Sequence, residues 1–239
     1  MNSLVHGTQE WFDSLNLRKP TQKPTKKVLI TLHGGCFVGG SANWDQPQIE
    51  FLRQLNPDQL HVYQLEFKKD NLKTTLQDIA RQVRELKTYY SPESHFYVLG
   101  RSSGGYLAKV LFDFCHSEQT KEKRFQHKER WVSSQNRLFE KAIYLAPVFN
   151  PITRGNKIPT LGEKARPFFD NQKSIYSTIE YDSNLERLFI PTHDENVPKE
   201  CYTEYQKKEA FSMNIKTHSA MCKTTSKEFA THLKEFLEI

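Results

Sequence analysis

Residues 98–106 read V-L-G-R-S-S-G-G-Y, an apolar run followed by a glycine-flanked pair of serines and then by a helical pattern. The letters G-R-S-S-G at 100–104 match the G-x-S-x-G pattern, in which a serine lies at the apex of a sharp strand-to-helix turn. Positions two before and two after the apex are crowded, so both favour glycine. Ser102 has glycine at both positions, whereas Ser103 would have Arg101 at one of them. The stretch therefore predicts Ser102 as a nucleophile; a plain Gly/Ser turn is the alternative.

The rest of the chain alternates between strand-like and helix-like segments. Short β-rich apolar runs occur at 28–32, 60–67, 96–99, 142–145, 185–190 and 211–216. Helix-like segments occur at 46–55, 72–86, 107–114, 199–208 and 229–237. Alternation of this kind predicts an α/β fold with a mostly parallel central sheet and helices on both faces.

The 239 residues are expected to form a single domain spanning 1–239. Residues 1–25 are expected to be an extended lead-in, since they run into a polar stretch punctuated by prolines. Residues 148–183 lack strong periodicity and are expected to form a long excursion that could be a small lid. Four basic residues of this excursion could meet an anionic substrate, although solvated surface side chains are the simpler interpretation: Arg154, Lys157, Lys164 and Arg166.

A second cluster of glycines follows the first strand-like run. Residues 33–40 read H-G-G-C-F-V-G-G, and seven of the chain's ten glycines lie in this stretch or in 98–106. Acyl transfer develops negative charge on a carbonyl oxygen, which fixed N–H donors must stabilise. In hydrolases with a G-x-S-x-G turn, such donors come from the residue after the nucleophile and from a loop of this type. We therefore predict an oxyanion hole made by the N–H groups of Gly34, Gly35 and Ser103.

A serine nucleophile needs a histidine to take its proton and a carboxylate to hold that histidine. In hydrolases with this turn the chain order is serine, then acid, then histidine. Asp194 lies just beyond one strand-like run and His218 lies in the loop after the next, so they are predicted as acid and base. Other residues are less favoured by their positions: Glu195 and Asp182 as acids, His193 and His232 as bases.

With these residues, the chain resembles the α/β-hydrolase superfamily, and most of all its small esterases and lipases of the hormone-sensitive-lipase or acetyl-esterase kind. The family motifs HGG-x-x-x-GG and G-x-S-x-GG stand here as H-G-G-C-F-V-G-G and G-R-S-S-G-G, and D-E-N-V-P at 194–198 also matches. The resemblance covers residues 25–239. It implies an eight-stranded sheet and hydrolysis of carboxylic esters with small or medium acyl groups through an acyl-serine intermediate, without a cofactor. Arg101 departs from the acidic residue that many lipase-like members carry before the nucleophile.

Several alternatives to a carboxylesterase stay open at this point, among them an acyltransferase that passes the acyl group to an alcohol or amine instead of water. Kynurenine formamidases and some peptidases resemble this outline too, so the substrate could be a small-molecule amide rather than an ester. The chain could also be a catalytically idle hydrolase fold used as a binding module. The sequence does not predict the oligomeric state.

Charge and cysteine content exclude several other classes. The formal net charge is +6, but the basic residues are scattered, and the dense run at 121–130 carries acids as well, so nucleic acid is not an expected partner. No Cys/His spacing suggests a metal, and the four cysteines form no CxxC pair. Without a signal peptide or an apolar run of about 20 residues, the chain is expected to be cytoplasmic and to lack a membrane span.

Overall fold

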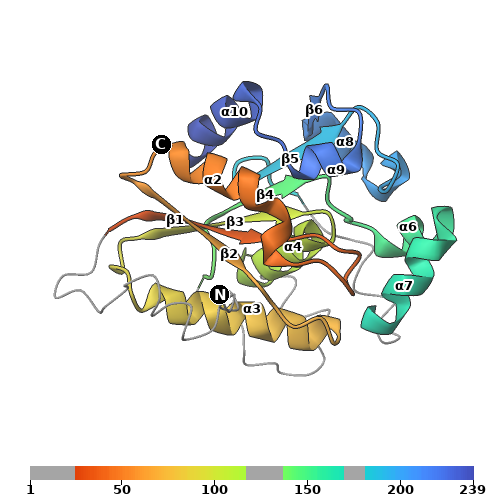
Figure 1. Ribbon diagram of the computed structural model, residues 1–239, viewed down its shortest axis with the longest axis horizontal. Helices are drawn as coiled ribbons and strands as arrows, with labels where there is room; N and C mark the ends of the chain where they lie inside the picture. Colours follow the sequence, from red (N-terminus) through yellow and green to blue (C-terminus); the bar gives the residue numbers. More distant parts are fainter. Residues whose placement is uncertain (1–24, 117–136, 170–180) are drawn as a thin grey trace.

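Six β-rich apolar segments of the sequence form one parallel sheet in the computed structural model, which describes residues 25–116, 137–169 and 181–239 (Figure 1). The strands are β1 (Lys27–Leu32), β2 (Leu60–Leu65), β3 (His95–Arg101), β4 (Lys141–Leu145), β5 (Glu186–Pro191) and β6 (Phe211–Met213). Their order across the sheet is β2-β1-β3-β4-β5-β6, and every neighbouring pair is parallel. The predicted α/β fold with a mostly parallel sheet is confirmed.

The strand count follows the sequence pattern rather than the family resemblance. All six strand-like runs form strands, whereas the eight-stranded sheet implied by the resemblance is not found among the described residues. The other described segments carry helical apolar spacing or prolines, which do not suit an interior strand. Strand β6 is shorter than the predicted run, because the amide of Ile215 donates to the carbonyl of Met213 at 2.7 Å and turns the chain away.

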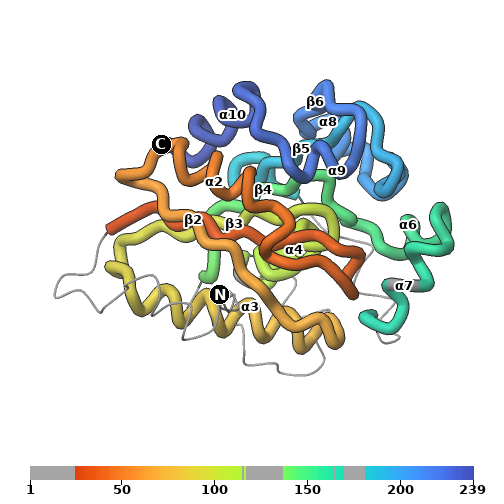
Figure 2. The backbone as a smooth tube through the Cα atoms, in the orientation of Figure 1, coloured from red at the N-terminus to blue at the C-terminus, as the bar shows by residue number. Residues whose placement is uncertain are grey.

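Helices cover both faces of the sheet. They are α2 (Gln46–Gln54), α3 (Leu72–Lys87), α4 (Ser103–His116), α6 (Pro151–Lys157), α7 (Pro159–Phe169), α8 (Glu204–Glu209), α9 (His218–Cys222) and α10 (Lys227–Leu237), with short 3-10 turns η1 (Ala42–Asp45) and η2 (Lys199–Cys201). The backbone trace shows α3 and α4 on one face and α2 and α10 on the other (Figure 2). Helices α6 and α7 lie together at one side of the molecule (Figure 1).

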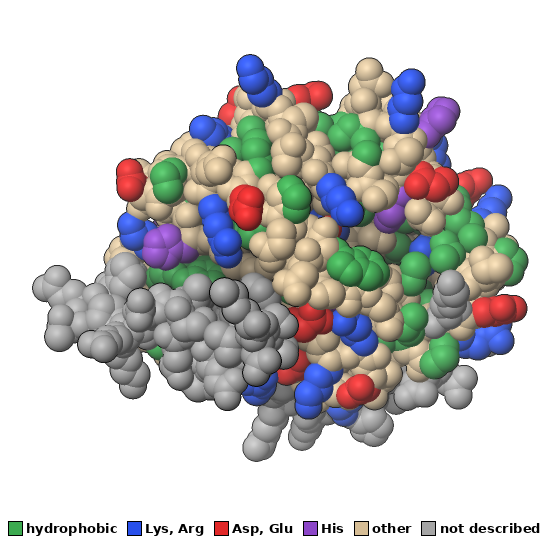
Figure 3. All heavy atoms as spheres, viewed as in Figure 1, with side chains coloured by type: hydrophobic (Ala, Val, Ile, Leu, Met, Phe, Trp, Pro, Cys, Tyr) green, Lys and Arg blue, Asp and Glu red, His purple; other side chains and the backbone are tan. Residues whose placement is uncertain are grey.

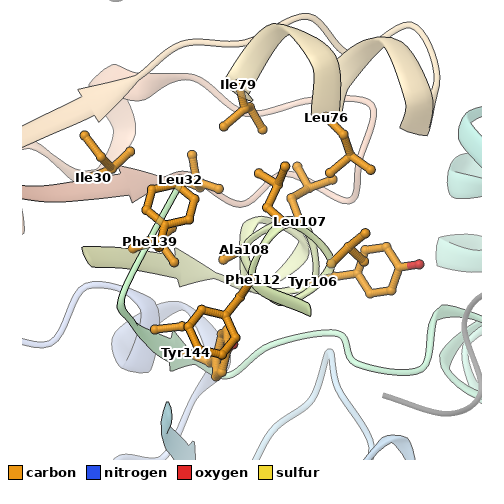
Figure 4. Close-up of a cluster of buried hydrophobic side chains, with 14 of the residues drawn as sticks. Ile30, Leu32, Leu76, Ile79, Tyr106, Leu107, Ala108, Phe112, Phe139 and Tyr144 are labelled. Carbon is orange, nitrogen blue, oxygen red and sulfur yellow. The ribbon is translucent and has the colours of Figure 1, made fainter. Parts of the chain in front are cut away.

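The core has two layers, one on each face of the sheet. Side chains alternate along a strand, so Val28 and Ile30 of β1 pack toward α3 and α4 while Leu29 packs toward α2 and α10. Figure 4 shows the first layer where β1, α3 and α4 meet, with the side chains of Ile30, Leu32, Leu76, Ile79, Leu107 and Ala108. Because both faces are covered, the central strands read as continuous apolar runs. Each fully buried Leu or Ile contributes about 1.5–3 kcal/mol to folding.

The helix predicted at 199–208 is interrupted. Residues Lys199–Cys201 form η2, and a new helix, α8, begins after Thr203. The Thr203 hydroxyl accepts a hydrogen bond from the amide of Gln206, and the Gln206 side chain accepts one from the amide of Thr203. This capping box starts a helix at Thr203, so the segment is two elements rather than one.

The predicted excursion at 148–183 contains two packed helices in its described part. Helices α6 and α7 touch at a pair of glycines, where a Cβ on Gly162 would lie 2.6 Å from the Cα of Gly155. Residues 170–180 of this excursion, residues 1–24 of the predicted lead-in and the basic run at 121–130 lie outside the described residues. A lid role for the excursion stays a prediction.

The surface mixes charges of both signs. On the face seen in Figure 3, Lys and Arg side chains are interspersed with Asp and Glu rather than gathered in one patch. Such mixing is typical of a solvated surface and does not favour a phosphate-backbone partner. Among the described helices, none has the length and apolar character needed to cross a membrane.

Candidate active site

The carboxyl ends of the strands meet at one edge of the sheet, and the strand order reverses there. Strand β2 lies on one side of β1, and β3 and all later strands lie on the other. The register pairs Leu32 of β1 with Gly100 of β3, so the two glycine-rich stretches begin side by side. Open α/β sheets bind ligands at such a reversal.

The turn after β3 holds Ser102 in a left-handed backbone conformation. Its φ is +52°, and α4 begins at the next residue. A Cβ on Gly100 would lie 2.4 Å from the carbonyl oxygen of Gly104, and a Cβ on Gly104 would lie 2.3 Å from the carbonyl oxygen of His33. Neither glycine leaves room for a side chain, so the crowding expected around this turn is present, although Gly104 meets the neighbouring loop rather than Gly100.

Three side chains predicted from the sequence lie within hydrogen-bond distance of one another. The Nε2 atom of His218 is 2.8 Å from the Oγ atom of Ser102, and Nδ1 of His218 is 2.9 Å from Oδ2 of Asp194. Ser102 and His218 are 6% and 8% exposed, so this chain of contacts is nearly shielded from water. His218 is the first residue of α9 rather than a loop residue, because Thr217 caps that helix by accepting from the amide of Ala220.

The loop after β5 holds the carboxylate of Asp194 in place. Its Oδ1 atom accepts hydrogen bonds from the amides of Asn196 at 2.9 Å and Val197 at 2.7 Å, which leaves Oδ2 for the imidazole. Glu195, the first fallback acid, accepts from the backbone amide of His218 at 2.9 Å and so fixes the start of α9 rather than the ring. The two adjacent carboxylates thus contact different parts of one histidine.

The surroundings of His218 change its pKa in opposite directions. Burial lowers the pKa, because it disfavours the charged imidazolium. The hydrogen bond to Asp194 and the contact with Cys222, whose Sγ atom is 3.7 Å from Nε2, outweigh burial and raise the pKa of His218 to about 10. The site therefore favours a positive charge on the imidazole once that ring has accepted a proton.

The loop after β1 lies directly against Ser102. A Cβ on Gly34 would lie 3.0 Å from Cβ of Ser102 and 3.7 Å from its Oγ atom, so the backbone of this loop comes close to the hydroxyl. Among the described residues, the amides of Gly34 and Gly35 donate no hydrogen bond. The amide of Ser103 lies in the first turn of α4, where N–H groups have no partner within the helix. Of the three predicted oxyanion donors, Gly34 thus lies beside Ser102 and Ser103 follows it directly, while Gly35 is the next residue of the Gly34 loop.

Glu66, directly after β2, holds this loop in place through its carboxylate. The sequence pattern did not predict this role. Glu66 accepts from the amide of Ala42 at 2.8 Å and lies 3.3 Å from Nε2 of His33. Lys69 donates to Glu66 at 2.6 Å and to the carbonyl of Gly40 at 2.8 Å. Burial alone raises the pKa of Glu66, but its contacts with His33, Lys69 and Ala42 hold that pKa well below its usual range. The ionised carboxylate ties both ends of the loop to the sheet.

Two buried residues beside the site were also not predicted. Arg101 is fully buried; its Nε atom donates to Oε1 of Gln48 and lies 3.7 Å from Oδ2 of Asp45. Cys222 lies on α9, one helical turn after His218, and touches Nε2 of that residue. Only the i, i+4 spacing of Cys222 relative to His218 could have signalled such a contact, and it depends on the helix that Thr217 begins.

The remaining candidates for these roles lie away from Ser102. Asp182 accepts from the amide of Asn184 in the turn before β5. His193 is exposed and contacts the carbonyl of Thr192, while the ring of His232 packs 4.3 Å from the ring of Phe211. Within the described ranges, no group of three or more His, Cys, Asp or Glu side chains is placed to hold a metal ion.

Comparison with known proteins gives likeness in structure only. No protein-family model and no curated protein matches the sequence. Esterase B from Lactobacillus rhamnosis is 18% identical with a TM-score of 0.60, covering 91% of this chain and 76% of that one. An esterase from Pyrobaculum calidifontis is 16% identical with a TM-score of 0.59, covering 92% and 78%. The esterase Est2 from Thermogutta terrifontis is 18% identical with a TM-score of 0.62, covering 91% and 84%.

At these identities the likeness is one of fold. It extends over about nine-tenths of the chain in each case, and the chain itself has a parallel sheet with helices on both faces. The chain therefore has the α/β-hydrolase fold.

Proposed function

We propose that this protein is a serine hydrolase that cleaves carboxylic esters of small or medium acyl groups, with Ser102 as nucleophile, His218 as base and Asp194 as the acid that orients it. The observation that carries the proposal is the continuous contact from Ser102 Oγ through both ring nitrogens of His218 to Asp194, at 2.8 and 2.9 Å. The esterases among the structural neighbours support the choice of esters.

In the first half-reaction, Ser102 Oγ attacks the carbonyl carbon of the ester while Nε2 of His218 takes the hydroxyl proton. The negative charge that develops on the carbonyl oxygen is met by the amides of Gly34, Gly35 and Ser103. One such donor typically lowers the barrier by about 2.7–4 kcal/mol. His218 then gives its proton to the departing alkoxide, which leaves an acyl group on Ser102.

In the second half-reaction, a water molecule attacks the acyl carbon. His218 accepts a proton from that water, the tetrahedral intermediate collapses, and the proton returns to Ser102 as the carboxylic acid leaves. Asp194 keeps Nδ1 protonated throughout, so Nε2 faces the serine as an acceptor. Its negative charge also stabilises the imidazolium that forms in each half-reaction.

Labelling with a fluorophosphonate probe tests the nucleophile directly. The native protein and the variant Ser103→Ala should be labelled, because the amide of residue 103 is kept, whereas Ser102→Ala should not be. Turnover of p-nitrophenyl acetate should fall by about 10³-fold or more in Ser102→Ala, in line with the loss of a triad member. Full turnover in that variant would overturn the assignment.

Labelling and turnover together separate the competing functions. A binding module of this fold would leave all three proteins unlabelled. An amide hydrolase would be labelled at Ser102 but would turn over formyl or acetyl anilides faster than the matching phenyl esters. A panel of p-nitrophenyl esters from acetate to octanoate would then define the acyl length.

A further inference from the structure

Arg154 of α6 lies buried between two loops of the candidate active site. It is 2% exposed. Its Nε atom donates to the carbonyl of Asn196 at 2.8 Å, and its Nη2 atom donates to Sγ of Cys36 at 3.3 Å. Cys36 follows Gly34 by two residues, and Asn196 follows Asp194 by two. The guanidinium therefore bridges the loop 33–40, which carries Gly34 and Gly35, and the loop that carries Asp194.

This buried cation lacks an anionic partner within the described part of the chain. Its two acceptors are a backbone carbonyl and the sulfur of Cys36, and no described carboxylate forms an ion pair with it. Its Nη1 atom makes no hydrogen bond to a described residue. Burying a charged group is costly unless it is paired, and buried arginines are normally paired with an anion.

Three acidic residues of the loop after β5 and of η2 already have partners. Asp194 binds the ring of His218 and two amides, and Glu195 binds the amide of His218. Glu200 pairs with the exposed Lys157 at 3.2 Å. None of these three carboxylates pairs with the guanidinium of Arg154, so an anionic partner from outside the described chain fits this position.

We propose that Arg154 binds a carboxylate of the substrate, so that the protein prefers esters that carry a negative charge on the acyl or the alcohol part. This inference rests on the proposed ester hydrolysis. The planar guanidinium suits a carboxylate, because two parallel N–H groups can bind both of its oxygens. Two other basic residues of the excursion differ from Arg154: Lys157 has its own acidic partner, and Arg166 is exposed. The side chain of Lys164 lies outside what the structure describes.

The test compares charged and neutral esters of nearly equal size. The native protein should hydrolyse 4-nitrophenyl hemisuccinate with a higher kcat/KM than 4-nitrophenyl butyrate if the carboxylate belongs to the acyl part. It should prefer 3-carboxyphenyl butyrate to phenyl butyrate if the carboxylate belongs to the alcohol. In Arg154→Met, loss of the bridge between the two loops should lower kcat/KM for charged and neutral esters alike. The readout is therefore the ratio of kcat/KM for the charged ester to that for its neutral counterpart, which should fall by about 10- to 100-fold, the usual size of a charge-assisted hydrogen bond.

Two variants separate recognition from a structural role. Arg154→Lys keeps the positive charge but not the two parallel N–H groups of the guanidinium, so it should keep part of the preference for the charged ester. Loss of packing alone would instead lower kcat/KM for charged and neutral esters alike in both variants. Arg81→Met removes one charge from an exposed position of α3 and should leave the preference unchanged. Equal kcat/KM values for charged and neutral esters in the native protein would overturn the inference.

A binding measurement keeps the inference distinct from the proposed function. Isothermal titration of Ser102→Ala with monomethyl succinate should give a Kd at least tenfold lower than with methyl butyrate. The difference should disappear in Ser102→Ala/Arg154→Met. Binding of the charged ester without hydrolysis by the native protein would refute the proposed function alone. Hydrolysis of neutral esters at Ser102 without any charge preference would refute the role of Arg154 alone.

Discussion

At the scale of single residues, the backbone of Ser102 is strained and tightly held. A non-glycine residue in the left-handed region typically costs about 1–3 kcal/mol. The amide of Ser102 donates to the carbonyl of Leu145 at 3.0 Å, and its carbonyl accepts from the amides of Gly105 at 3.0 Å and Val148 at 3.1 Å. The bonds to Leu145 and Val148 tie the turn to the end of β4, and the bond to Gly105 closes the turn itself, so the hydroxyl is positioned before any substrate arrives.

The pKa of His218 leads to a pH prediction. A base must be neutral to accept a proton, and the pKa of His218 is raised, so kcat/KM should increase with pH until the ring loses its proton. In Asp194→Asn the pKa should fall, because the neighbouring charge is gone, and the rising limb should move to lower pH. The rate itself should fall by up to about 10⁴-fold, because the amide no longer holds the required tautomer.

A kcat/KM profile for p-nitrophenyl acetate measures this shift. Asp182→Asn is the matched control, since that carboxylate lies in the turn before β5 and does not contact His218. A rising limb that stays at the native pH in Asp194→Asn would show that another group controls it.

The sequence predicts some of these residues and not others. Ser102 could be found because its turn demands glycine at two fixed positions, and Asp194 and His218 because each follows a recognisable strand. Glu66 could not be found in this way, and Arg154 could be named only as one of four basic residues of the excursion. Their contacts join segments far apart in the chain, and such contacts depend on strand order and on the packing of α6, which local pattern does not contain.

At the scale of elements, the loop 33–40, which carries two of the proposed oxyanion donors, is fixed from two sides. Phe37 has a φ of +72° and is buried, and its ring packs 4.7 Å from that of Phe169 and 5.6 Å from that of Tyr106. On the other side, Glu66 binds His33 and the amide of Ala42. The loop is thus anchored to helices α4 and α7 and to strand β2 at once, which preorganises its amides.

The variant Glu66→Gln should loosen this loop without removing a donor. We expect kcat for p-nitrophenyl acetate to fall while KM changes little, because the loop acts on the transition state rather than on bound ester. The loss should be smaller than the roughly 100- to 1,000-fold drop that follows removal of one oxyanion donor. Glu85→Gln on α3 is the control; a KM effect without a kcat effect would contradict the assigned role.

Element boundaries were harder to predict than element types. The single helix expected at 199–208 is wrong because the chain restarts at Thr203, although the T-E-Y-Q letters of its capping box are visible in the sequence. The end of β6 could not be predicted, because the apolar residues continue to Ile215 while the hydrogen bonding of the sheet stops at Met213. The pattern of apolar residues indicates which side chains are buried, and at β6 the partly buried side chain of Ile215 lies past the last hydrogen-bonded residue of the strand.

At the scale of the whole molecule, the sheet separates the core into two layers that should behave independently. Ile79 of α3 and Leu233 of α10 are both fully buried, but on opposite faces. Ile79→Val should lower the free energy of unfolding by about 0.5–1.5 kcal/mol and Leu233→Ala by about 2–5 kcal/mol. In the double variant the two losses should add to within about 0.5 kcal/mol, because the sites share no neighbours.

Urea unfolding of the three variants measures this additivity. The pair Ile79→Val and Leu107→Ala is the comparison, since these side chains lie in the same layer (Figure 4) and should deviate from additivity by more than about 0.5 kcal/mol. Coupling across the sheet as large as coupling within one layer would mean that the two faces do not act as separate cores.

The strand order has a consequence for biosynthesis. The serine turn and the oxyanion loop belong to β3 and β1, which are made early, whereas Asp194 and His218 follow β5 and β6, toward one margin of the sheet. A nascent polypeptide that ends after β4 would already contain the residues of the serine turn, yet it would lack the imidazole proposed to deprotonate Ser102. Under the proposed mechanism, the Ser102 hydroxyl should therefore stay unreactive toward esters until translation has passed position 218.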